Sequence, residues 1–269
     1  MLLGDLEPER VLAVGESQSG FALTTYANGV QPLTDTFDGF LIHSRGGATA
    51  PLGVFDKGVD IASTLGGSPT LLRDDLDVPV LTLESETDVV GILNYLPARQ
   101  PDTDTFRLWE VAGTAHADRF ALGAVSDQLG CPAPVNDGPQ HLVAKAALRA
   151  LDAWVRDGSL PPAGDRFAVE GGAYARDEDG IVRGGIRTPP VDVPVDVLSG
   201  DPAPDGPLQC LLFGSTTPLP DARVAQLYGD PAVYLRAFED SADAVIAAGF
   251  VLPEDREALL AYAQPDRVG

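Results

Sequence analysis

Four short runs of apolar residues lie within the first 111 residues, and each has the pattern of a strand buried in a sheet. The runs begin at Val11, Phe37, Val78 and Phe106. Strands that are covered on both faces read as continuous apolar runs, whereas half-exposed strands alternate apolar and polar positions. We therefore predict four buried strands in this part of the chain.

Helical patterns separate and follow these runs. Residues 18–28 predict a helix that packs Phe21, Ala22 and Tyr26 inward, and a short helix is predicted near residues 89–96. The strongest pattern spans residues 142–156 and ends at Gly158. Its apolar stripe consists of Leu142, Ala146, Leu148, Leu151, Trp154 and Val155. Strands that alternate with helices predict an α/β class.

The rest of the chain has a different pattern. Residues 44–77 are rich in glycine, proline and serine and are too long for a tight crossover, so they predict a cap or pocket wall. Residues 167–185 predict a hairpin that turns at 177–180, and residues 233–249 and 253–263 predict two amphipathic helices. We predict a core over residues 1–162, with a cap-like insertion over 44–77, and a mixed α+β appendage over 163–269 that docks on the core.

The most informative motif is Gly-Glu-Ser-Gln-Ser-Gly at residues 15–20, directly after the first apolar run. A strand that enters a tight turn of small residues is the setting of a nucleophile elbow, which holds a serine Oγ above the end of a parallel sheet. The motif requires small residues two positions before and after the serine. Ser17 meets this condition with Gly15 and Ser19, whereas Ser19 would have the bulky Phe21 as one flank. Ser17 is the candidate nucleophile, and an ordinary strand-to-helix turn is the alternative.

A candidate acid and a candidate base follow the third and fourth apolar runs. Three acidic residues, Glu84, Glu86 and Asp88, lie at the end of the third run. Alternation along a strand places all three side chains on the same face, so it cannot select one of them. Asp88 fits best because two apolar residues, Val89 and Val90, directly follow it. Glu86 is the next choice. His116 follows the last strand, where a general base is expected. The order serine, acid, histidine is that of α/β-hydrolases and differs from the orders in chymotrypsin and subtilisin.

The other two histidines have different expected roles. His43 ends the second apolar run, so we expect it near the site. His141 stands at the start of a helix, where capping or packing is expected.

Composition excludes several classes of partner. The chain has 18 Lys and Arg against 40 Asp and Glu, for a net charge of −22, and nucleic-acid binding requires a basic surface. No apolar run approaches the length of a membrane span. No signal peptide is visible, because the first residues lead directly into acidic ones. We expect no nucleic acid, no membrane and a cytoplasmic location.

The cysteine pattern leaves two alternatives open. Cys131 and Cys210 are the only cysteines; they form one disulfide if they meet, and two free thiols are equally compatible with a cytosolic chain. No cysteine and histidine spacing resembles a zinc site. We expect no metal and no cofactor.

The chain resembles the "α/β hydrolase domain" proteins of actinobacteria and other bacteria over nearly its whole length. The matching pieces are the elbow and the segments 83–88, 112–118, 136–141, 185–189 and 213–218. The resemblance implies a serine-dependent hydrolase of esterase type, with Ser17, an acid near Asp88 and His116 in the triad roles. It implies little about the substrate.

The chain departs from the usual hydrolase fold at its beginning. The nucleophile strand is usually the fifth, yet only residues 1–10 precede it here. We therefore expect a partial α/β-hydrolase fold that starts at the nucleophile strand. The backbone N–H of Gln18 can supply one oxyanion donor, and we expect the loop that usually supplies the second to be missing. Because loss of one donor costs about 10²–10³-fold in kcat, we expect a weak enzyme.

Three functional hypotheses follow. The leading one is hydrolysis of a small-molecule carboxylic ester by Ser17, Asp88 and His116. The second is a non-catalytic remnant or interaction module that pairs, or self-associates, through an exposed sheet edge, since unpaired edges recruit strands; a fragment of a longer hydrolase is a further alternative. In the third, the same triad cleaves an amide, peptide or thioester bond instead of an ester, because amidases, peptidases and thioesterases use the same constellation.

Overall fold

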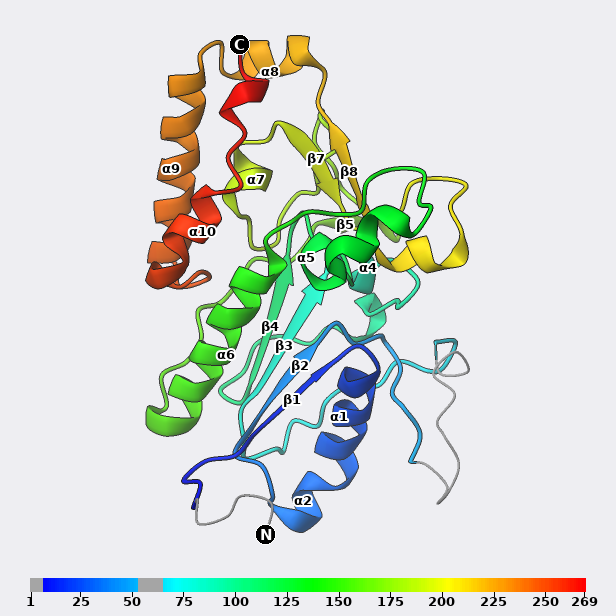
Figure 1. The fold of residues 1–269 in the computed structure, drawn as a ribbon. Coiled ribbons are helices and arrows are strands. Elements are labelled where there is room, and N and C mark those ends of the chain that lie inside the picture. Colours follow the sequence, from blue (N-terminus) through cyan, green and yellow to red (C-terminus); the bar gives the residue numbers. More distant parts are fainter. Residues whose placement is uncertain (1–6, 53–64) are drawn as a thin grey trace.

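The computed structural model describes residues 7–52 and 65–269 (Figure 1). The expected cap over residues 44–77 lies partly outside the described residues, at 53–64. Its described parts contain neither helix nor strand.

A four-stranded parallel sheet forms the centre of the first part of the chain, in the order β1-β2-β3-β4 (Figure 1). The strands are β1 (Leu12–Glu16), β2 (Gly39–His43), β3 (Val80–Ser85) and β4 (Phe106–Val111). The four predicted strands are confirmed, although three begin one or two residues later than their apolar runs. Because all four run in the same direction, the residues that follow each strand meet at one edge of the sheet.

Two helices cover opposite faces of this sheet. Helix α6 (Gln140–Asp157) packs Leu142, Ala146 and Leu151 against inward side chains of β2, β3 and β4. Helix α1 (Gln18–Gly29) lies on the other face, where its residues join a second apolar cluster. Each large side chain buried in this way contributes about 1.5–3 kcal/mol to folding.

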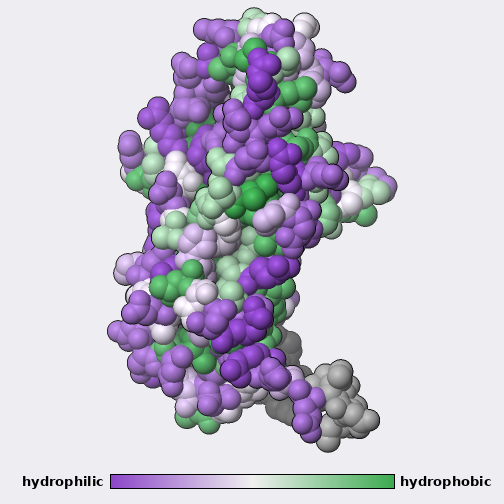
Figure 2. Space-filling view, turned by 90° about the vertical axis from the view of Figure 1, so that its left-hand side faces the viewer, coloured by the Kyte–Doolittle hydropathy of each residue, from purple (hydrophilic) through white to green (hydrophobic). Residues whose placement is uncertain are grey.

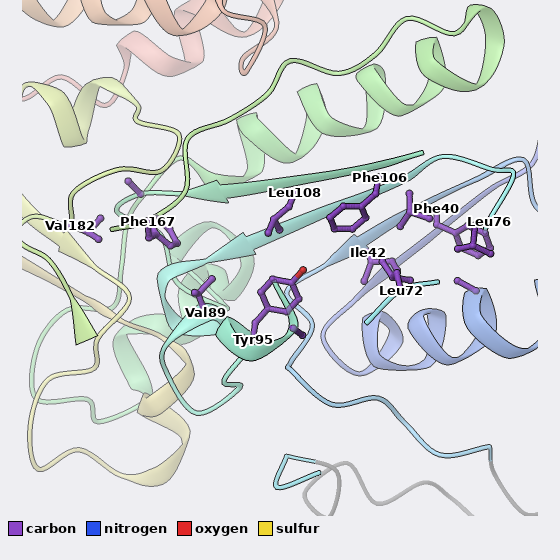
Figure 3. Packing of buried hydrophobic residues seen from close by; sticks show 14 of the residues in the cluster. Phe40, Ile42, Leu72, Leu76, Val89, Tyr95, Phe106, Leu108, Phe167 and Val182 are labelled. Carbon is purple, nitrogen blue, oxygen red and sulfur yellow. The ribbon is translucent and has the colours of Figure 1, made fainter. Parts of the chain in front are cut away.

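The cluster on the α1 face continues beyond that helix (Figure 3). Phe40, Ile42 and Leu108 from the strands meet Tyr95 from the segment after β3, and Phe167 extends the cluster toward the C-terminal part of the chain. One apolar layer therefore joins residues that are more than a hundred positions apart.

Several details of the predicted helices are wrong. Ala22 is exposed, although Phe21 is buried as expected, and Leu148 is 42% exposed. The helix predicted near residues 89–96 is replaced by α4 (Glu86–Val89) and a 3₁₀ turn at Leu96–Ala98. Ala22 and Leu148 lie at the edges of their predicted apolar stripes. Successive residues of a helix are about 100° apart, so a residue at the edge of a stripe can face the solvent.

The C-terminal part contains small sheets and a helical layer. A hairpin of β5 (Val169–Glu170) and β6 (Ala173–Tyr174) continues into the predicted turn at 177–180, so the chain turns twice in this stretch. Strands β7 (Asp196–Ser199) and β8 (Ser215–Pro218) form a second antiparallel pair. The helices are α7 (Pro189–Asp192), α8 (Asp221–Leu227), α9 (Pro231–Ala247) and α10 (Arg256–Leu260).

The two edges of the central sheet differ. On the β4 side, the N–H of Ile186 donates to Glu110 and its carbonyl accepts from Ala112, so the C-terminal part continues that edge. Strand β1 has no such neighbour among the described residues, and Val14 is 55% exposed there.

A disulfide joins Cys131 to Cys210 across 79 residues. It connects the segment around α5 (Arg119–Leu122), which follows β4, to the turn at Leu208–Leu212. Of the two alternatives that the sequence left open, the structure contains the paired one.

Hydrophilic residues cover most of the face that α6, α9 and α10 form (Figure 2). Such a surface agrees with the strongly acidic composition. No helix within residues 7–52 and 65–269 is both long enough and apolar enough to cross a membrane.

Candidate active site

Ser17 occupies a strained turn between β1 and α1. Its backbone has φ 52° and ψ −121°, a region that residues other than glycine rarely adopt. This conformation is typical of a nucleophile elbow, which turns the side chain away from the strand and the helix.

Two glycines allow this turn. A Cβ at Gly15 would lie 2.7 Å from the carbonyl oxygen of Ser19, and a Cβ at Gly20 would lie 2.9 Å from the carbonyl oxygen of His43. The flank two residues after Ser17 is the exposed Ser19, and the close approach to β2 is made by Gly20 instead. The serine that the motif selects lies in this turn, but Gly20 supplies the space that the motif attributes to its second flank.

Ser17, His116 and Asp88 form a continuous hydrogen-bonded chain. His116 Nε2 lies 2.9 Å from Ser17 Oγ, and His116 Nδ1 lies 2.7 Å from Asp88 Oδ1. The three residues come from the ends of β1, β3 and β4, which the parallel sheet brings to one edge. His116 is 6% exposed and Asp88 is fully buried.

Hydrogen bonds in the first turn of helix α4 hold the Asp88 side chain in place. Its Oδ2 accepts hydrogen bonds from the N–H of Ser85 at 2.7 Å and from the Ser85 hydroxyl at 2.6 Å. Burial acts to raise the pKa of Asp88, but the facing His116 and these two donors outweigh it, and the pKa lies below its ordinary value. Asp88 is therefore ionised at neutral pH.

The electrostatics of His116 are a balance of the same kind. Burial acts to lower its pKa, but the Asp88 carboxylate and, more weakly, Glu16 raise it, and the net pKa lies above the ordinary 6.5. Because Asp88 accepts a hydrogen bond from Nδ1, the neutral ring carries its proton there. Nε2 is then free to accept the proton of Ser17.

The three candidate acids point in different directions, contrary to the sequence analysis. Helix α4 begins at Glu86, so the alternation of the strand ends there and only Asp88 reaches His116. Glu86 instead accepts backbone N–H groups from Gly113 and Gly200. Glu84 is buried in the sheet opposite Glu110, and burial raises its pKa well above the ordinary value.

The other histidines lie where expected. The His43 carbonyl accepts the N–H of Ser17 at 3.0 Å, so β2 supports the elbow, and burial lowers the pKa of the His43 ring. His141 stacks on Phe120 with 3.6 Å between ring centroids, which is a packing role.

The Gln18 N–H opens helix α1 directly beside Ser17. The first N–H groups of a helix have no intrahelical acceptor, so this group is free to bind an anion. The described residues contain no group of three or more side chains that could hold a metal ion.

Sequence reasoning missed the support of this site. The sequence gives no role to Ser85 or Asn136, and it suggests Glu86 only as a triad acid. One signal was present: Asn136 lies in a segment that matched the resembled family. The contacts of Glu86 and Asn136 join residues that lie far apart in the chain, and local sequence patterns do not reveal such contacts.

A family model described as "Alpha/beta hydrolase domain" matches residues 1–261 of the chain. No curated protein and no solved structure matches it.

Proposed function

The chain belongs to the alpha/beta hydrolase domain family, and on this premise we propose that it is a serine hydrolase that cleaves carboxylic esters. The family suggests hydrolase activity without defining the bond. The observation that carries the proposal is the unbroken chain of hydrogen bonds from Ser17 through His116 to Asp88. This arrangement matches the roles of nucleophile, base and orienting acid.

The reaction would proceed in two steps. Ser17 Oγ attacks the ester carbonyl while His116 Nε2 takes its proton, and the same nitrogen then returns the proton to the departing alcohol. An acyl group remains on Ser17. Water, deprotonated by His116, releases it as a carboxylic acid and restores the serine.

Asp88 and Gln18 would stabilise the charges that develop. Asp88 keeps the proton on Nδ1 and faces the imidazolium that forms in the transition state. The Gln18 N–H would donate to the oxyanion, because it follows the nucleophile and lies at a helix start.

Hydrolysis of short acyl esters of 4-nitrophenol tests the proposal. We expect measurable release of nitrophenol by the wild-type chain and a loss of at least about 10³-fold in Ser17→Ala. Ser19→Ala is the matched control, since that serine is two residues away and exposed. Equal rates for wild type and Ser17→Ala would reject the assignment of Ser17.

The bond cleaved is a separate question. Amides, peptides and thioesters are cleaved by the same constellation, so a panel with matched acyl groups is required. We expect the highest kcat/KM on oxygen esters. A higher value on thioesters or amides would keep the triad and change the substrate class.

A second candidate function rests on the open edge of β1. Val11 and Val14 are 38% and 55% exposed, and exposed strand edges tend to pair with another strand. If the chain is an interaction module that self-associates there, size-exclusion chromatography will show concentration-dependent dimers. A monomer at all concentrations, with no binding of a hydrophobic dye, would exclude it.

A further inference from the structure

Two buried side chains join the loop that carries His116 to the C-terminal part of the chain. Glu86 accepts the N–H of Gly113 at 2.6 Å with one oxygen and the N–H of Gly200 at 3.0 Å with the other. Asn136 Nδ2 donates to the carbonyls of Gly113 and Ser199, both at 3.1 Å. Glu86 and Asn136 are both fully buried. Gly113, three residues before His116, is thus held at both its N–H and its carbonyl.

The residues after His116 are held by the same neighbourhood. The Asn136 carbonyl accepts the N–H of Arg119 at 2.8 Å, and the carbonyl of Leu212 accepts the N–H of Ala117 at 3.0 Å. The N–H of Gly138 donates to Asn136 Oδ1 at 2.8 Å, which fixes the orientation of the amide. Asn136 therefore contacts the loop on both sides of His116.

The packing leaves little room for the loop to move. Gly113 has φ +69°, and a Cβ there would overlap Val191. A Cβ at Gly200 would overlap Glu86. Segments that are packed this closely transmit a displacement from one to the other, because protein interiors are densely packed.

Among the residues that the structure describes, Arg176 is the one cation that lies close to Glu86. Arg176 Nη2 lies 3.6 Å from its Oε2, and Arg176 also binds Asp201. Burial and, more weakly, Asp201 raise the pKa of Glu86 to about 7, although the two backbone donors and Arg176 act to lower it. The two N–H groups are therefore its main hydrogen-bond partners.

We infer that Glu86 and Asn136 are positioning residues, which set the place of His116 between Ser17 and Asp88. This inference rests on the proposed function. His116 has to make bonds of 2.9 Å and 2.7 Å on opposite sides of one ring, and a misplacement of about 1 Å can cost about 10²-fold in rate. The C-terminal part of the chain thereby becomes a supporting part of the active site.

Two substitutions disturb the contacts with little change in size. Glu86→Gln replaces one acceptor oxygen by an NH₂ group, and Asn136→Asp places an oxygen against two carbonyls. We expect kcat on a short ester to fall about 10–100-fold in each, with KM changed less than about threefold because both side chains are fully buried. Glu239→Gln, an exposed change on α9, is the matched control and should keep wild-type kinetics.

Proton NMR supplies a readout that a merely structural role would not move. The proton between His116 Nδ1 and Asp88 should give a low-field resonance, identified by its loss in His116→Gln. We expect this resonance to shift or broaden in folded Glu86→Gln and Asn136→Asp and to stay unchanged in Glu239→Gln. Folded variants with kcat within twofold of wild type and an unchanged resonance would overturn the inference.

Hydrogen exchange of the wild-type chain tests the inference even if the variants do not fold. The amides of Gly113 and Gly200 should exchange together and slowly, and exchange of Gly113 at the rate of an exposed loop would overturn the inference. The proposed function fails separately, if Ser17→Ala hydrolyses esters at the wild-type rate. The resonance and the exchange rates still decide the positioning role in that event.

Discussion

The nucleophile side and the base side of the candidate triad are built in different ways. Ser17 is half-buried at the end of β1, an edge strand of the sheet among the described residues, and its turn is set by neighbours within the segment 15–20 and by the carbonyl of His43. Asp88 and His116 follow interior strand β3 and strand β4, whose outer edge is covered, and are almost completely buried.

The difference lies in the range of the supporting contacts. Steric demands of adjacent residues and one bond to the His43 carbonyl hold Ser17. The loop of His116 is bonded to Glu86 and Asn136 across 27 and 23 residues, and Glu86 is bonded in turn to Gly200 across 114 residues. The base side therefore depends on the complete fold, and the nucleophile side depends mainly on a short motif. Substitutions on the two sides should have different signatures.

The largest expected effect is on the base side. In Asp88→Asn the amide oxygen still accepts from Ser85, so the NH₂ group faces His116 and forces the proton onto the wrong ring nitrogen. We expect kcat to fall about 10⁴-fold with little loss of stability. Ser85→Ala, which removes one donor, should cost far less. If Asp88→Asn keeps a tenth of the activity while Glu86→Gln loses all of it, Glu86 is the acid instead.

The disulfide should have the largest effect on stability. Cys131→Ser combined with Cys210→Ser opens a loop closed across 79 residues, and loss of such a constraint lowers the free energy of unfolding by about 2–4 kcal/mol. Urea denaturation measures this, with reduced wild type as a second sample. An unchanged midpoint would show that the cysteines are not paired in solution.

The state of the two cysteines also bears on the location of the protein. Disulfides persist in oxidising compartments, whereas the sequence predicts a cytoplasmic chain. Thiol labelling of the protein as isolated from its native cells shows which holds. We expect no labelling before reduction, and two labelled cysteines without reduction would favour the cytoplasm.

A smaller effect is expected on the nucleophile side. Gly20→Ala places a Cβ 2.9 Å from the carbonyl of His43, so we expect a loss of about 1–3 kcal/mol in unfolding free energy. Gly29→Ala is the control in the same helix, because nothing lies within 4 Å of its Cβ. That change should be neutral or stabilising by up to about 1 kcal/mol. Equal effects of the two changes would contradict the close approach at Gly20.

The smallest effect is expected at the open edge. Val14→Lys should change the unfolding free energy by no more than about 0.5 kcal/mol, since Val14 is largely exposed. If the chain self-associates through β1, the same change should shift it to a monomer on size-exclusion chromatography, because edge lysines discourage pairing. Dimers that survive the substitution would place the contact elsewhere.

The sequence predicts the nucleophile side well because its information is local. The run before Ser17, the small flanks and the order of serine, acid and histidine were enough to select three residues that the fold brings together. The choice between Asp88 and Glu86 could not be made from strand alternation, since α4 begins at Glu86 and changes the direction of successive side chains. The contacts of Asn136 and Gly200 depend on the packing of the C-terminal part, which no local pattern encodes.

The most direct test of the central claim is the pH dependence with which Ser17 reacts with a fluorophosphonate probe, with the labelled peptide identified by mass spectrometry. Neutral His116 is required to take the serine proton, and its pKa lies above 6.5 because the Asp88 carboxylate outweighs the opposing effect of burial. The rate should therefore rise with pH through a midpoint above 6.5, with the label on Ser17 and none in His116→Gln. A label on Ser19, or a rate on Ser17 that is independent of pH and of His116, would contradict the account.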